Sequence, residues 1–185
     1  PYSFSKALGE SALYRLHSQW SEEPSAPELT VIRATSVMGT ARRTTRMLAR
    51  FASSPLSSVA GDGTAPTPVT SVTALAQFTA SVGEFRGELP PVILQPWEGA
   101  TTGSVLRDAG RRHPLNLPPL LCRAVIACAR FGSGAVGHRY AGLIRRLEVT
   151  WFGQRQVPGW AHEHGVIPQP HVQEILREAH LALGR

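Results

Sequence analysis

The first ten residues contain a tyrosine and a lysine whose spacing could support acid–base chemistry. Tyr2 and Lys6 are four residues apart, so in a helix both side chains lie on one face, about 6 Å from each other. A phenol with an ordinary pKa of about 10 exchanges protons poorly at neutral pH. An ammonium about 4 Å away favours the phenolate by at most about 4 kcal/mol, or about three pKa units. The pair therefore predicts a proton-shuttling tyrosine and a lysine that can donate hydrogen bonds to a ribose.

A helix is needed to hold these two side chains together. Leu8, Ala12, Leu16 and Trp20 recur at helical spacing, which predicts an amphipathic helix over 5–20. The prolines of the following segment end that helix, and a β-branched run over 29–33 predicts a buried strand. Taken alone, the pair has a simpler interpretation, in which Tyr2 is a partly buried tyrosine at a helix start and Lys6 is its solvated neighbour.

The remaining elements alternate between strand and helix in the first half and are mostly helical after residue 115, which favours an α/β fold. The patterns predict strands over 67–70 and 91–94, a turn at 61–63, and helices over 42–52, 72–82, 103–111, 120–131, 140–149 and 171–183.

Two motifs resemble a known family. The segment 1–10 is similar to the active-site helix of the extended short-chain dehydrogenase/reductases, the NAD-dependent epimerase/dehydratase family, because Tyr2, Ser5, Lys6 and Glu10 all fit its Tyr-x-x-Ser-Lys pattern and the Glu that follows. The segment 31–39 resembles the strand and loop that come next in that family, with Ala34 in place of Pro and Met38 in place of an aromatic residue.

A weaker likeness continues along the chain. Gly61-Asp62-Gly63 and the segment 69–76 are similar to the family's Gly-Asp-Gly loop and to the segment that follows it, although the family's His and Asp are absent from 69–76. The resemblance implies the C-terminal part of a Rossmann-type NAD(P)-binding fold plus a mostly helical substrate-binding domain. Residues 1–95 would complete the Rossmann-like domain, with a substrate-domain insertion at about 40–62, and residues 96–185 would form the substrate-binding region.

By the same resemblance, Tyr2 and Lys6 are the catalytic residues and, with Val37, they bind the cofactor. Tyr2 would be the acid/base, Lys6 would hold the nicotinamide ribose, and the loop near Val37 would line the nicotinamide through backbone groups. The cofactor would be NAD or NADP, and the substrate a small molecule such as a nucleotide sugar. The family implies epimerase, dehydratase or reductase activity, and pairing of two copies through the helix that carries Tyr2.

The family's cofactor site also needs a glycine-rich turn that holds the pyrophosphate, and in the family this turn precedes the tyrosine. The chain begins at Pro1 rather than at a methionine, which predicts a processed, trimmed or fragmentary chain. We therefore expect the isolated chain to bind NAD(P) weakly and to be inactive. The alternative is a non-catalytic remnant or binding module of the same fold, which the departures at Ala34, Met38 and 69–76 favour.

Composition excludes several other classes. The net charge is +6, yet Lys6 is the only lysine and the arginines are scattered, a distribution that argues against nucleic-acid binding. Two cysteines exclude a four-thiolate zinc site and a disulfide scaffold. The longest apolar stretch, 115–131, holds two arginines and is too short to span a bilayer. We expect a cytoplasmic protein without membrane contact.

Four further patterns receive ordinary structural interpretations. The string 132–137 matches GxGxxG but follows a helical pattern, so it predicts a helix stop and a loop. His162 and His164 suit one face of a strand and lack a third metal ligand. Cys122 and Cys128 are expected to be buried thiols. Leu121, Val125 and Cys128 lie opposite Arg123 and Arg130, which favours a helix packed on a core over a helix on a membrane surface.

Overall fold

The computed structural model describes residues 2–20, 28–136, 141–157 and 159–183, with the backbone alone for 2–3, 133–136 and 141. These residues form a mixed α/β structure. In chain order the elements are α1 Tyr2–Trp20, β1 Val31–Arg33, β2 Ser36–Met38, α2 Arg43–Ser53, β3 Ser58–Ala60, β4 Val69–Ser71, α3 Val72–Glu84, β5 Val92–Leu94, α4 Thr102–Gly110, β6 Leu115–Leu117, α5 Pro119–Val136, α6 Ala141–Phe152, α7 Trp160–Glu163 and α8 Val172–Leu181.

The described strands are short and pair in parallel. β1 pairs with β5, β2 with β4 and β3 with β6, each as a two-stranded sheet. Parallel pairing means that the two strands of a pair end at the same edge, and the segments that follow them meet there. β4 leads directly into α3, whose first turn is capped by the Ser71 hydroxyl accepting from Ala74 N at 2.9 Å.

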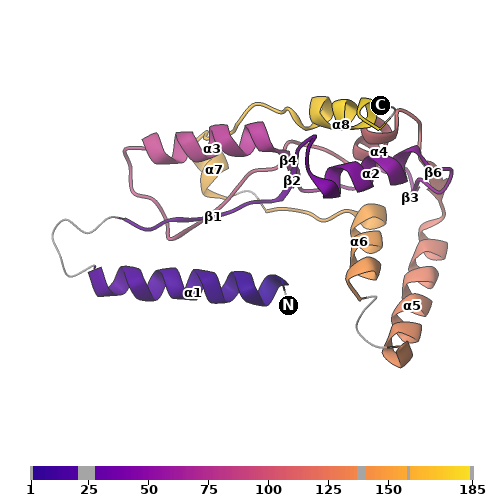
Figure 1. Cartoon of the computed structure of the whole chain (residues 1–185), viewed down its shortest axis with the longest axis horizontal. Coiled ribbons are helices and arrows are strands. Elements are labelled where there is room, and N and C mark those ends of the chain that lie inside the picture. The colour runs from indigo at the N-terminus through magenta and orange to yellow at the C-terminus, as the bar shows by residue number, and fades with distance from the viewer. Residues whose placement is uncertain (1, 21–27, 137–140, 158, 184–185) are drawn as a thin grey trace.

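The largest hydrophobic core lies among α2, α4 and α8 (Figure 1). Helix α2 buries Ala49 and Ala52 against α4, and α8 covers both with Leu176 and Ala179. The small side chains let the helices approach closely, as at Gly110 of α4, where a Cβ atom would lie 2.2 Å from Ala52 O.

Two smaller cores complete the packing. Phe78 of α3 and Ile93 of β5 form one of them with α7. The other joins α5 and α6 through Cys122, Ile126 and Trp151, and the Trp151 indole donates to Ser58 Oγ at 3.2 Å. In Figure 1, α5 and α6 stand side by side as an arm that extends from the rest of the molecule.

Three expectations about local structure are wrong. The helix at 120–131 does not stop there, because α5 continues through Gly132 to Val136; Gly137 lies outside the described residues. His162 belongs to the helical turn α7 and not to a strand. Cys128 is exposed, whereas Cys122 is buried, and burial raises the pKa of the Cys122 thiol.

Candidate active site

Two polar contacts hold α1 against the first strand pair. Arg33 Nη2 at the end of β1 donates to Glu10 Oε1 at 2.7 Å, and the Tyr14 hydroxyl donates to Pro91 O, just before β5, at 2.9 Å. Because β1 and β5 run parallel, Pro91 marks their amino end and Arg33 their carboxyl end. Tyr14 therefore lies near the amino ends of β1 and β5, and Glu10, one turn closer to the start of α1, lies near their carboxyl ends.

This direction places the amino end of α1 beyond the carboxyl ends of the strands. Lys6 lies one helical turn past Glu10 and Tyr2 one turn further, at about 6 Å per turn. The Lys6 side chain is exposed. In open parallel α/β folds, ligands bind outside the carboxyl ends of the strands. The α1 backbone thus extends Tyr2 and Lys6 beyond the carboxyl ends of β1 and β5.

The Tyr2 side chain lies outside the described part of the structure, so its pairing with Lys6 stays a prediction. What the described residues do show is a contact between the two motifs of the sequence analysis. Glu10 belongs to the first motif and Arg33 to the second, and they form an ion pair. This hydrogen bond raises the pKa of Arg33, so the guanidinium stays charged.

Val37 differs from its expected setting. The sequence predicted a loop, but Val37 is the middle residue of strand β2 and is paired in register with Thr70 of β4. Its side chain is half-buried. Because strand pairing engages backbone N–H and C=O groups, fewer of them can contact a ligand at Val37 than in a loop.

A network of hydrogen-bonded polar side chains, which the sequence did not reveal, lies at β4 and just after β5. Gln95, which follows β5, is fully buried; its side-chain amide donates to Thr70 Oγ1 at 2.8 Å and its backbone N–H donates to Arg33 O at 3.1 Å. Thr70 in turn donates to Glu98 Oε1 at 3.0 Å. The available signal was Gln95, a polar residue directly after the apolar run 91–94.

The Glu98 carboxylate is fully engaged. Besides Thr70, it accepts from the backbone N–H groups of Ser71 at 2.5 Å, of Val172 at 2.6 Å and of His171. His171 and Val172 open α8, where unpaired backbone donors and the helix dipole favour a negative charge. Glu98 thus fastens α8 to β4 through hydrogen bonds to both of its oxygens. Gln95 Oε1 is different, because it is buried without a hydrogen-bond partner in the described structure.

Other candidate sites lie away from α1. A surface pocket of about 470 Å³ lies between the ends of α2 and α8, lined by Arg50, Ser53, Ser54, His180, Leu181 and Leu183. His180 Nδ1 lies 3.2 Å from Ala109 O and 3.1 Å from Ser53 Oγ. The Ser53 hydroxyl donates to Ala49 O at 2.8 Å. No His, Cys, Asp and Glu side chains in the described ranges gather in threes to hold a metal.

Comparison of the chain with protein-family models, with curated proteins and with solved structures returned no match. Within the described ranges, no helix has the length and apolar character to cross a bilayer.

Proposed function

We propose that the chain belongs to an NAD(P)-dependent epimerase, dehydratase or reductase of the extended short-chain type, with Tyr2 as the acid/base and Lys6 beside it. The observation that carries this proposal is the Glu10–Arg33 ion pair. It joins the two motif segments and, with the Tyr14 contact, orients α1 so that Lys6 projects past the strands.

The residues present fit the nicotinamide end of such a cofactor. The Lys6 ammonium has three N–H donors, which suit the hydroxyls of a ribose, and the segment 34–37 follows β1 at the same edge. The cofactor, when bound, accepts or returns a hydride. The Tyr2 hydroxyl would move the matching proton at the substrate oxygen. The string 132–137 does not supply a pyrophosphate turn, because residues 132–136 belong to α5.

The packing supports one substrate-side unit made of 40–62 and 96–185. Helix α2, from the first segment, makes its main core with α4 and α8, from the second. This unit would cover a small-molecule substrate, such as a nucleotide sugar, above the strand ends.

A non-catalytic module of the same fold is the second candidate. It is favoured by the position of the described pocket, whose lining residues come from α2, α8 and the segments that follow them, and not from α1. The two candidates differ in the pKa of Tyr2. The enzyme requires a lowered pKa for proton transfer, whereas a non-catalytic module does not.

Titration of the tyrosines in the chain tests this property directly. We expect one of the three phenols to ionise one to three pKa units below the usual value of about 10. That early transition should be missing in Tyr2→Phe and should move towards about 10 in Lys6→Met. Tyr14→Phe is the matched control and should leave it in place. Three phenols that all ionise near the usual pKa would contradict the proposal.

In an active preparation that contains this chain, Tyr2→Phe should lower kcat for hydride transfer by about a thousandfold, since general acid–base catalysis contributes roughly 10²–10⁴. The Kd for NAD(P) should stay within about twofold, because the phenol acts on the substrate oxygen and adds little to cofactor binding. Rapid mixing and cofactor fluorescence measure the two quantities. A Phe variant with normal turnover would remove Tyr2 from the mechanism.

A further inference from the structure

Helix α5 presents an apolar face that the rest of the described structure does not cover. Its packed side is formed by Cys122 and Ile126, which are buried against α6. On the opposite side, Leu120 is 78% exposed and Phe131 is 91% exposed. The expected packing of Leu121, Val125 and Cys128 into a core is wrong, because all three are exposed. We call this surface the α5 outer face, and it comprises Leu120, Leu121, Ala124, Val125, Cys128 and Phe131.

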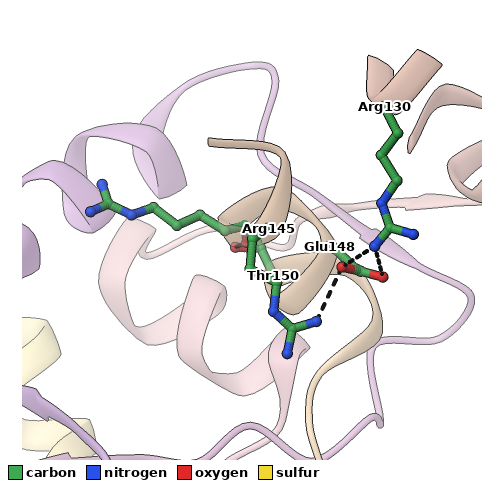
Figure 2. Close-up of polar contacts among 5 residues, drawn as sticks. Arg130, Arg145, Glu148 and Thr150 are labelled. Atoms are coloured by element: carbon green, nitrogen blue, oxygen red, sulfur yellow. Dashed lines mark hydrogen bonds and ion pairs between the residues drawn. The ribbon is translucent and has the colours of Figure 1, made fainter. Parts of the chain in front are cut away.

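The charged residues of α5 lie outside this face. Arg130 Nη2 donates to Glu148 of α6 at 2.8 and 2.9 Å, and the Arg123 guanidinium lies 5.8 Å from the ring centre of Phe152. Both contacts turn these arginines towards α6, as Figure 2 shows for Arg130. Residues seven apart share a helix face, so Arg123 and Arg130 form one basic border along the outer face.

The whole α5–α6 arm is basic. Helices α5 and α6 contain four arginines and a single acidic residue, Glu148. Glu148 is already held between Arg130 and Arg145, which donates at 3.1 Å (Figure 2). A second copy of the chain would bring these arginines against one another. An anionic surface would instead receive both the apolar face and the positive charge.

We propose that the α5 outer face binds the surface of an anionic lipid bilayer. The helix would lie in the plane of the headgroups, with Leu120, Leu121 and Phe131 inserted among the acyl chains. The positive charge of Arg123 and Arg130 along the border would attract the anionic headgroups. In Figure 1, α5 extends away from the α2–α4–α8 core.

Cys128 provides a probe within the face itself. Its thiol is exposed, whereas Cys122 is buried, so a polarity-sensitive fluorophore attached to Cys128 reports the environment of α5. We expect its emission to shift to shorter wavelength with vesicles containing phosphatidylglycerol, and at least about tenfold less partitioning into pure phosphatidylcholine. Partitioning should fall as salt rises. Equal partitioning into both lipids, or none into either, would overturn the proposal.

Matched variants distinguish binding through the α5 outer face from non-specific binding through other exposed apolar residues. Leu120→Ser with Phe131→Ser should lower partitioning of unlabelled chain, measured by vesicle sedimentation, at least about tenfold. Phe4→Ser with Leu8→Ser removes the same two residue types from α1, where they are 65% and 52% exposed, and should change it less than about twofold. Equal losses in both pairs would overturn the proposal. So would a concentration-dependent dimer that Leu120→Ser with Phe131→Ser abolishes, since a second copy would then cover the face.

Discussion

Among the described side chains, Glu98 accepts the most hydrogen bonds from residues distant in the sequence. Its two oxygens accept from Thr70, Ser71, His171 and Val172. In Glu98→Gln one oxygen becomes an NH₂ group that faces N–H donors, and the negative charge at the start of α8 is lost. We expect the free energy of unfolding to fall by about 3 kcal/mol, because hydrogen bonds to charged groups are worth about 1.5–3 kcal/mol each. Urea denaturation measures the loss.

Glu174→Gln is the control for this substitution. Glu174 also lies in the first turn of α8, but its side chain is 70% exposed. Loss of its charge should cost less than about 0.5 kcal/mol, mostly through the helix dipole. If both variants lost the same stability, the bonds of Glu98 would not be holding α8 in place.

Glu148 makes the stability of the α5–α6 arm depend on pH. Hydrogen bonding from Arg145, together with the charge of Arg130, lowers the pKa of Glu148 below its ordinary 4.5. A lowered folded-state pKa stabilises the fold above the ordinary value, and this contribution is lost as pH falls through the folded-state value. Glu148→Gln should thus cost less than about 1 kcal/mol at pH 7, since the pair is exposed.

The difference between wild type and Glu148→Gln should vanish below the folded-state pKa, because protonated Glu and Gln are then alike. Urea denaturation of both proteins at neutral and acid pH measures it. A difference that persisted unchanged in acid would mean that packing of the side chain, not its charge, joins the two helices.

Between elements, the crossing of α2 and α4 depends on Gly110. A Cβ atom there would lie 2.2 Å from Ala52 O and 2.5 Å from Ala52 C, and backbone atoms cannot give way as a flexible side chain can. Gly110→Ala should therefore destabilise the chain by about 2 kcal/mol through overpacking. Gly83→Ala, in α3, meets nothing within 4 Å and should stabilise by about 0.5 kcal/mol. Thermal unfolding distinguishes the two, and similar effects would contradict the close crossing.

Helices were more predictable from the sequence than strands, for a physical reason. The predicted helix over 42–52 is confirmed as α2, in which Thr45, Ala49 and Ala52 lie on one helical face and are buried. All the described strands have three residues, too few for an alternation to show. The apolar or β-branched runs that predicted strands contain or overlap β1, β4 and β5, whereas β2, β3 and β6 were missed. At 132–136, two glycines and a serine indicated a stop, but the helix continues.

The candidate site was predictable only where local spacing carried it. Lys6 and Glu10 follow from positions on one helix, and the structure adds that Glu10 reaches Arg33. The network of Thr70, Gln95 and Glu98 depends on contacts between residues 25 to 28 positions apart, which no local pattern reveals. The α5 outer face shows the converse error, because apolar residues at helical spacing say nothing of whether another element covers them.

Across the whole molecule, α1 is the least supported long helix. From Phe4 to Trp20 no side chain is buried, and two of the tertiary contacts that orient the helix are the Glu10–Arg33 pair and the Tyr14 hydrogen bond. Helix α4, in contrast, buries six residues, of which Val105, Leu106 and Ala109 belong to the main core. Exposed ion pairs contribute at most about 1 kcal/mol, and most helical stability in proteins comes from packing of an apolar face.

Amide hydrogen exchange should therefore separate these two helices. We expect the interior amides of α1 to exchange at least about a hundredfold faster than those of α4, since opening α1 breaks few contacts whereas opening α4 exposes the core. Glu10→Gln should accelerate exchange in α1 and leave α4 unchanged. Protection of α1 equal to that of α4 would contradict the weak tertiary support that the exposed side chains of α1 indicate.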